Sequence, residues 1–191
     1  TISAISAVRF AEDGTSQLNL NRFVSDVDGE TGGYQWTASG NQNVTIRITG
    51  ASATFGAPAN WSGSEQITFT VRDPGGLEAS SSTQVTVTPV NDPPTLTSAS
   101  PVAFDEDGSS TVDLSQIGSD PDGETLRWLA SSPNRNIQTT VSGSTLNLSS
   151  VANWSGGPVS VAITATDPAR ASVNGTISVT VRAVNDPPTL A

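Results

Sequence analysis

The sequence predicts an all-β chain built from two tandem β-sandwiches, and three observations support this. The 191 residues repeat themselves at an interval of 94 residues. Apolar residues alternate with polar ones, which is the period-two pattern of a strand with one buried face. The chain contains 17 Gly and 12 Pro, and its hydrophobic fraction of 35% is sufficient for the small cores of such sandwiches.

The repeat sets the expected domain boundaries. Residues 90–96, Val-Asn-Asp-Pro-Pro-Thr-Leu, recur at 184–190, and four further motifs recur 94 or 93 residues later. These are Glu-Asp-Gly at 12–14, Ser-Asp-x-Asp-Gly-Glu at 25–30, Ala-Asn-Trp-Ser-Gly at 59–63 and Asp-Pro at 73–74. We therefore expect repeat 1 at 1–94 with its linker at 90–94, repeat 2 at 95–188 with its linker at 184–188, and the start of a further repeat at 189–191. On this interpretation the chain is a piece of a longer array.

Each repeat contains short alternating segments separated by turn signals, and no stretch has a convincing helical period. The alternation predicts about seven strands per repeat, arranged as an Ig-like Greek-key sandwich. The linker Asp92-Pro93-Pro94 favours a stiff, extended backbone, so we expect the two sandwiches to lie end to end. The alternating apolar positions are Leu18, Leu20, Val44, Ile46, Ile48, Ile67, Phe69, Val71, Val85 and Val87, then Val112, Leu114, Leu146, Leu148, Val159, Val161, Ile163, Ile177, Val179 and Val181.

The residue types that the chain lacks exclude several kinds of function. Without His or Cys, it has no zinc, haem or iron–sulfur site of the usual kind and no Ser–His or Cys–His nucleophilic pair. The net charge of −10, from 18 acidic and 8 basic residues, argues against nucleic acid and anionic membranes as partners. No apolar run approaches the roughly 18 residues of a membrane span.

The acidic residues recur at matched positions in the two repeats. Asp-Gly turn chemistry alone accounts for Asp13, Asp28, Asp107 and Asp122 as well as metal binding does, so both alternatives stay open there. It does not account for Asp-x-Asp pairs or for an Asp that ends an apolar strand. In extended backbone an Asp-x-Asp pair places both carboxylates on one side of the chain. Such carboxylates repel one another, and a hard cation such as Ca²⁺, which takes oxygen ligands, relieves that repulsion.

Together these motifs resemble a known family. The linker VNDPPT, the early EDG, the SDxDGE motif and the strand-ending Asp-Pro resemble the bacterial cadherin-like tandem repeats of large surface adhesins, a family that includes dystroglycan-type cadherin-like domains. More distantly they resemble animal cadherins. The resemblance covers the whole chain twice. It implies that Ca²⁺ binds between successive domains, through an early Glu, the Asn-Asp linker, an Asp-x-Asp pair and a late Asp.

Carried onto this sequence, the resemblance implies one complete site and two partial ones. Pro89 and Ala183 stand where the animal cadherin linker begins with an acid, which implies fewer ions and an affinity of roughly 10⁻⁴–10⁻³ M. The mid-domain Asp-Arg-Glu ligand group is also absent. The implied ligands are Glu12, Asn91, Asp92, Asp120, Asp122 and Asp167 at the interdomain site, Asp26, Asp28 and Asp73 at the N-terminal partial site, and Glu106, Asn185 and Asp186 at the C-terminal partial site.

The four Trp residues support two interpretations. Trp36 and Trp128 lie in strand-like segments and are predicted to be core residues. Trp61 and Trp154 lie in Asn-Trp-Ser-Gly turns. There a half-exposed ring either stacks on a sugar or caps the sandwich and anchors its loop.

The leading prediction is a calcium-binding, calcium-rigidified module of a large bacterial cell-surface or secreted adhesin, acting outside the cell as a stalk or extender in cell adhesion. The alternative is a carbohydrate-binding module of a polysaccharide-attachment or polysaccharide-degrading protein. We do not expect an enzyme, because the same carboxylates occur in two tandem copies near a linker, which does not suit a catalytic cleft. The expected partners are adjacent repeats of the same chain, with cell-surface proteins or polysaccharides as further partners.

Overall fold

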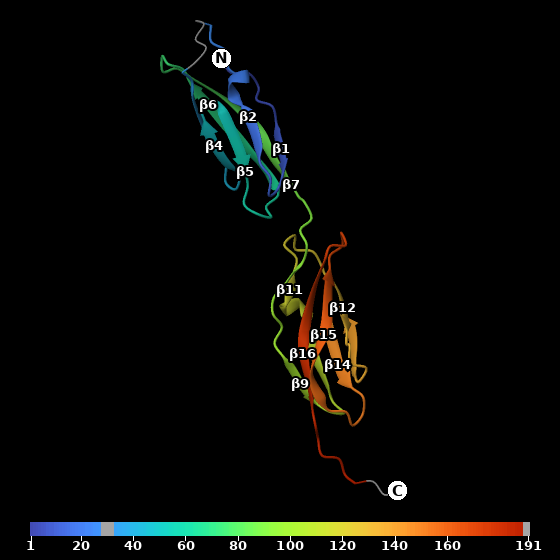
Figure 1. Ribbon diagram of the computed structural model, residues 1–191. Helices are drawn as coiled ribbons and strands as arrows, with labels where there is room; N and C mark the ends of the chain where they lie inside the picture. Colours follow the sequence, from blue (N-terminus) through green and yellow to red (C-terminus); the bar gives the residue numbers. More distant parts are fainter. Residues whose placement is uncertain (28–32, 189–191) are drawn as a thin grey trace. The chain divides into compact units, whose positions relative to one another are not determined.

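The computed structural model describes residues 1–27 and 33–188. The chain divides into two compact units, unit 1 (Thr1–Val90) and unit 2 (Asn91–Ala191). Both units are built almost entirely of strands (Figure 1), so the predicted all-β fold with two tandem sandwiches is confirmed. The predicted start of a further repeat at 189–191 lies outside the described residues. In the described part of the chain, no helix is long and apolar enough to cross a membrane.

Unit 1 is a sandwich of a four-stranded and a three-stranded sheet. All its strand pairs are antiparallel except the first and last strands, β1 and β7, which pair in parallel. In sheet order, the four-stranded sheet is β1 (Val8–Ala11), β7 (Glu78–Thr88), β6 (Gly63–Arg72) and β3 (Gln35–Ser39), and the three-stranded sheet is β2 (Ser16–Asn19), β5 (Ser52–Gly56) and β4 (Thr45–Thr49).

Unit 2 repeats this topology and adds a short two-stranded ribbon. The ribbon pairs β8 (Thr95–Leu96) with β11 (Gly118–Ser119), where unit 1 has the single bridge Ile2↔Val24. In sheet order, the larger sheet is β12 (Arg127–Ser131), β15 (Gly156–Thr166), β16 (Ser172–Arg182) and β9 (Val102–Asp105), and the smaller is β10 (Ser109–Asp113), β14 (Thr145–Ser150) and β13 (Ile137–Ser142).

Two single-turn 3₁₀ helices interrupt the alternation that the sequence shows at Leu20 and Leu114. These are η1 (Leu20–Arg22) and η2 (Leu114–Gln116). Each begins after a capping residue whose side chain accepts a backbone N–H two residues later, and such a cap favours a helical turn over continued strand. Leu20 and Leu114 are nonetheless fully buried, so the pattern identified core positions correctly but not their local conformation.

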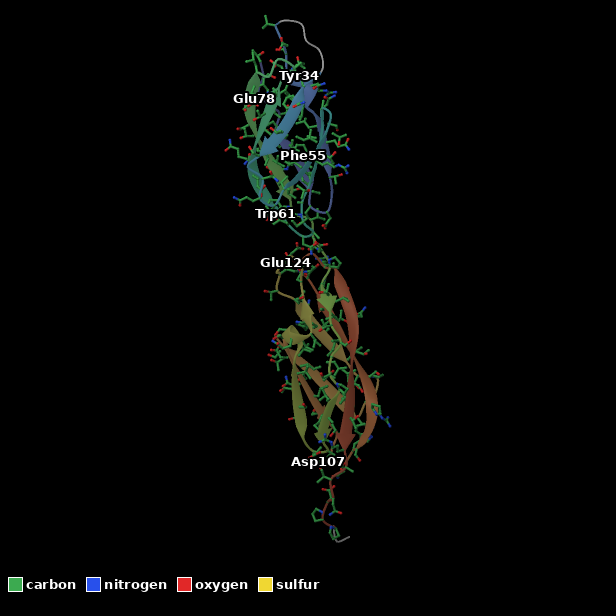
Figure 2. The ribbon with its side chains drawn as sticks, turned by 90° about the vertical axis from the view of Figure 1, so that its left-hand side faces the viewer. Tyr34, Phe55, Trp61, Glu78, Asp107 and Glu124 are labelled. Atoms are coloured by element: carbon green, nitrogen blue, oxygen red, sulfur yellow. The ribbon has the colours of Figure 1, made fainter. Side chains whose placement is uncertain are left out.

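Each unit has its own hydrophobic core between its two sheets. In unit 1 the rings of Phe55 and Phe69 meet edge to face, with centroids 6.2 Å apart and an interplanar angle of 78°, a favourable geometry for aromatic pairs. Trp36 and Trp128 are 7% and 5% exposed, which confirms the prediction that they are core residues. Figure 2 shows Phe55 in the middle of unit 1, with Tyr34 and Glu78 towards one end and Trp61 towards the other.

Candidate metal centre

Acidic side chains gather at the end of unit 2 where residues 91–95 enter, which we call the N-terminal pole of unit 2. The sheet topology brings them there, because Asp120 directly follows β11 and Asp167 directly follows β15. Glu124 lies on the turn that continues from Asp120. Figure 2 shows Glu124 at this end of the unit and Asp107 at the opposite end.

Asp167 is held rigidly by the turn that it begins. Its Oδ1 accepts a hydrogen bond from the backbone N–H of Ala171 at 2.8 Å. Its Oδ2 accepts one from the side-chain amide of Asn91 at 2.9 Å. Asp167 is only 4% exposed, so both carboxylate oxygens have fixed directions and one of them already contacts the linker residue.

Asp120 has a buried carboxylate oxygen that is available to bind a ligand. Its Oδ1 accepts the backbone N–H of Asp122 at 2.9 Å. Its Oδ2 is buried and has no hydrogen-bond partner within the described chain, and the residue as a whole is 9% exposed. A buried carboxylate oxygen that lacks a partner is costly, and a bound cation would remove that cost.

The geometry of the carboxylate cluster suits one hard cation. One oxygen each from Asp120, Glu124 and Asp167 lie within 4.8 Å of one another. Two oxygens that share a Ca²⁺ at 2.3–2.6 Å lie at most about 5 Å apart, so the three fit a single ion. Glu124 is exposed; desolvation, and then the nearby negative charges of Asp120, Asp167 and Asp122, raise its pKa, and the second of these causes reflects the crowding of the acids.

The linker is attached to the same pole by its backbone. The N–H of Asp92 donates to Asp122 Oδ2 at 2.8 Å. Unit 2 therefore brings together five of the six residues predicted for the interdomain site, namely Asn91, Asp92, Asp120, Asp122 and Asp167.

The sixth predicted residue, Glu12, belongs to unit 1 and has another partner there. Its Oε1 accepts the N–H of Val90 at 2.7 Å, and its own N–H donates to Thr88 O at 3.0 Å. Glu12 thus fastens the end of unit 1 to β1. Its role as a metal ligand stays a prediction.

Glu124 joins the cluster although the sequence analysis assigned it no ligand role. It is the last residue of the Asp-x-Asp-Gly-Glu motif and recurs at position 30 of the first repeat, which was the available signal. The Asp120–Gly123 turn is what folds it back, with the N–H of Gly123 donating to Asp120 O at 3.1 Å.

The residues of the N-terminal partial site lie at the corresponding pole of unit 1. Asp73 forms the same turn as Asp167, with its Oδ1 accepting the N–H of Leu77 at 2.8 Å. Asp26 lines a hollow beside Asp73. The third predicted ligand, Asp28, lies outside the described residues.

The residues of the C-terminal partial site are not gathered into a carboxylate cluster. Glu106 Oε1 accepts the N–H of Val184 at 2.7 Å, as Glu12 does with Val90. Asn185 and Asp186 are exposed, and the side-chain amide of Asn185 donates to the neighbouring carbonyl of Asp186 at 3.4 Å. Of the described residues, those of the N-terminal pole of unit 2 alone form a group of three or more potential metal ligands.

Trp61 and Trp154 are half-buried and pack against their own cores. Each ring lies over the Gly two residues later, and a Cβ on Gly63 or Gly156 would come within 2.8 or 3.0 Å of it. These contacts match the capping interpretation of the two rings. Sugar binding by Trp61 and Trp154 stays a prediction.

Comparisons with known proteins identify both units. Residues 1–88 and 91–180 each match the family model of the bacterial Ig domain. No curated protein matches the chain. Among solved structures, extracellular cadherin domains 3–6 of protocadherin gamma B2 are similar, with a TM-score of 0.60 and 17% identity over 97% of this chain and 48% of that chain. The human desmocollin-1 ectodomain has a TM-score of 0.54 and 15% identity over 97% of this chain and 36% of that one.

An endo-fucoidan hydrolase of glycoside hydrolase family 107 is less similar, with a TM-score of 0.41 and 20% identity over 96% of this chain. The chain spans only 28% of that hydrolase. At these identities the structural matches establish the fold alone, an Ig-like and cadherin-like repeat. Because the family model covers nearly the whole of both units, the chain belongs to the bacterial Ig domain family.

Proposed function

We propose that the N-terminal pole of unit 2 binds Ca²⁺ through Asp120, Glu124 and Asp167, with Asp122, Asn91 and Asp92 as neighbouring oxygen donors. The observation that carries the proposal is the buried Oδ2 of Asp120, which has no hydrogen-bond partner among the described residues and lies in a cluster of carboxylates. Calcium accepts six to eight oxygens in irregular geometry, whereas Mg²⁺ requires a near-ideal octahedron.

The charge at this pole supports a divalent ion. Asp92, Asp120, Asp122, Glu124 and Asp167 bring five carboxylates to one end of the unit. After desolvation, the charges of Asp120, Asp167 and Asp122 raise the pKa of Glu124, so Glu124 is repelled by these three neighbours. A cation that relieves this repulsion binds the folded unit and not the unfolded chain, so it stabilises the fold.

The same ion would stiffen the chain where the two units join. Val90 is bonded to unit 1 through Glu12, and Asn91 and Asp92 are bonded to unit 2 through Asp167 and Asp122. Calcium held at the pole would make the bonds of Asn91 and Asp92 persistent. We propose on this basis a calcium-stiffened repeat of an extracellular adhesin, with a supporting rather than an enzymatic role.

Isothermal titration calorimetry of the whole chain with CaCl₂ tests calcium binding. We expect an affinity in the range of roughly 10⁻⁴–10⁻³ M, and Asp120→Asn should weaken it about tenfold or more because one charged ligand is lost while the turn bond to Asp122 is kept. Asp105→Asn removes the same charge from an exposed site and should leave binding unchanged. If the unaltered chain shows no heat of binding up to several times the upper limit of this range, the proposal is wrong.

Calcium should also stabilise unit 2 against heat. At about 100 times the Kd, binding to the folded state adds about 2.7 kcal/mol, which corresponds to a rise of about 10–20 °C in Tm for a unit of this size. Calorimetric melting in calcium and in chelator measures this shift. In Asp120→Asn the shift should largely disappear. Small-angle scattering under the same two conditions tests the stiffening separately.

A further inference from the structure

The two sides of the carboxylate cluster in unit 2 have different surroundings. On one side, Asp167 Oδ2 accepts the side-chain amide of Asn91 at 2.9 Å, so the linker lies against that side. On the other side, Asp120 and Glu124 line a hollow in the surface of unit 2, which we call the unit 2 hollow. Asp167 is not among the described residues that line it. A cation held by the three carboxylates would therefore be open to solvent towards the hollow.

The unit 2 hollow is large enough for a small ligand. It lies between η2, β11, the turn that follows β11 and the turn between β13 and β14, and its volume is about 470 Å³, whereas ligand pockets span roughly 300–1,000 Å³. Gly123 and Gly143 line it with φ angles of +74° and +61°, and a Cβ on either would meet nothing within 4 Å. These φ angles favour glycine, so no side chain at either position fills the hollow.

The lining of the hollow favours a neutral ligand that carries hydroxyl groups. None of the described lining residues is basic, so a phosphate, a sulfate or a carboxylate finds no opposite charge there. One divalent cation neutralises only two of the five carboxylates at this pole, and the remaining negative charge repels an anion. Hydroxyl side chains both donate and accept hydrogen bonds, as the hydroxyl groups of a sugar do. The lining residues with a hydroxyl are Ser115, Ser119, Thr125 and Ser144.

The calcium proposed for this pole leaves room for further oxygen ligands. Calcium accepts six to eight oxygens, whereas the cluster brings one oxygen each from Asp120, Glu124 and Asp167 within 4.8 Å of one another. Positions that face the hollow are open to the oxygens of a ligand. Two hydroxyl groups on adjacent carbons of a sugar ring are close enough to reach the same ion. Leu126, which is half-buried and lines the hollow, offers an apolar contact to the C–H groups of the ring.

We propose that the unit 2 hollow binds a neutral sugar unit of a glycan, with two adjacent hydroxyl groups directed at the calcium site and the ring against Leu126. The inference rests on the proposed calcium site and adds a ligand to it. A single sugar makes few contacts, so we expect a dissociation constant of about 1 mM or weaker. Because coupling between two ligands is reciprocal, the sugar should tighten calcium binding by the same factor by which calcium tightens sugar binding.

Two-dimensional ¹H–¹⁵N NMR of the whole chain tests the inference with simple neutral sugars. The probes are methyl α-D-glucopyranoside, methyl α-D-mannopyranoside and methyl β-D-galactopyranoside, which together present trans and cis pairs of adjacent hydroxyl groups. In calcium, at least one of them should shift the amide signals of Gly123 and Gly143 in a saturable manner. In chelator, the same concentrations should leave these signals in place. The anionic methyl β-D-glucuronide should shift them less than the neutral sugars do.

A variant that fills the hollow separates sugar binding from calcium binding. Thr125 is exposed and lines the hollow, but it is not one of the three clustered carboxylates. Thr125→Trp should therefore bind calcium in calorimetry as the unaltered chain does and lose the sugar-induced shifts. Thr37→Trp, the same change at an exposed position of β3 in unit 1, should alter neither. The melting profile of each variant is the control for folding.

The outcomes distinguish this inference from the calcium proposal. Calcium binding without any sugar-induced shift overturns the inference and leaves the calcium proposal standing. Equal shifts in calcium and in chelator overturn it as well, because the ion then takes no part. Shifts that persist in Thr125→Trp place the sugar elsewhere and have the same consequence. If calorimetry detects no calcium binding, the proposed function fails, and the inference fails with it.

Discussion

Unit 1 and unit 2 hold the same loop by different means. In unit 1 the loop after β3 is fastened by Glu65 of β6, whose carboxylate accepts the backbone N–H groups of Gln42, Asn43 and Val44 at 2.9, 2.7 and 3.2 Å. Glu65 pairs with Val85 in the sheet, and its counterpart in unit 2 is Val159, which pairs with Val179.

In unit 2 the loop after β12 supports itself. Asn134 accepts the N–H of Asn136 through Oδ1 at 2.9 Å, and its own N–H donates to Ser132 Oγ at 3.1 Å. The comparison shows that one loop position in one fold is stabilised either by a distant charge or by neighbouring neutral side chains. Of these two loops, only the one that is held by the carboxylate of Glu65 should make the free energy of unfolding depend on pH.

The two cores also differ in the kind of side chains that pack at matching positions. Unit 1 uses the edge-to-face pair of Phe55 and Phe69, whereas Leu148 and Ile163 stand at the corresponding positions of unit 2. All four side chains are essentially buried. The core of unit 1 thus contains an edge-to-face aromatic contact at positions where unit 2 has two aliphatic side chains.

Phe69→Ala is expected to have the largest effect, a loss of about 3–5 kcal/mol from unit 1 through the cavity that it leaves. The matched change Ile163→Ala in unit 2 should cost about 2–5 kcal/mol, because a smaller side chain is removed. Differential scanning calorimetry should show only the transition of the altered unit moving. If one substitution lowers both transitions equally, the two units do not unfold independently and the comparison fails.

Glu65→Ala should cost unit 1 about 1–3 kcal/mol at neutral pH, because three N–H groups lose an ionised acceptor. Asn134→Ala, the matched change in unit 2, should cost about 0.5–1.5 kcal/mol, since it removes neutral hydrogen bonds. Urea unfolding curves of the two variants measure the difference. Equal losses in the two variants would show that the charge of Glu65 contributes nothing beyond its hydrogen bonds.

The pH dependence should separate the units further. Burial acts to raise the pKa of Glu65, but hydrogen bonds to its carboxylate outweigh this and lower the pKa below 4.5. These bonds come from the backbone N–H groups of Asn43, Gln42 and Val44 and from the side-chain amide of Asn43. A lowered pKa in the fold gives stability that is complete above pH 4.5 and is lost as the pH falls through the lowered value. At neutral pH the free energy of unfolding of unit 1 should be larger in the unaltered chain than in Glu65→Gln. This difference should become smaller as the pH is lowered.

When calcium is absent, ionisation of Glu124 should destabilise unit 2, whereas ionisation of Glu65 stabilises unit 1. Desolvation, and then the charges of Asp120, Asp167 and Asp122, raise the pKa of Glu124 above 4.5, so its ionisation destabilises the folded unit. In chelator, Glu124→Gln should stabilise unit 2 at neutral pH, and this gain should shrink as the pH falls through the raised pKa and vanish below pH 4.5. Denaturation of both chains between neutral and acidic pH measures it. A gain that does not change with pH would mean that the carboxylates do not interact.

Much of the fold could be read from local patterns. The alternation at Ile67, Phe69 and Val71 placed a strand and its buried face correctly, because a period of two residues is a local property of extended backbone. The repeated Asp-x-Asp and strand-ending Asp likewise located Asp120 and Asp167, since turns and strand ends carry their own residue preferences. The sequence by itself therefore determined the fold class, the positions of the cores and most of the acidic cluster.

Only the tertiary structure decided which distant residues meet. The parallel pairing of β1 with β7, the capture of the Gln42–Val44 loop by Glu65 and the attachment of Val90 to Glu12 join residues that are far apart in sequence. It also brought Glu124 to Asp120 and left the Oδ2 of Asp120 buried without a hydrogen-bond partner among the described residues. Periodicity and turn chemistry describe each segment alone, whereas these contacts depend on the free energy of the whole packed sandwich.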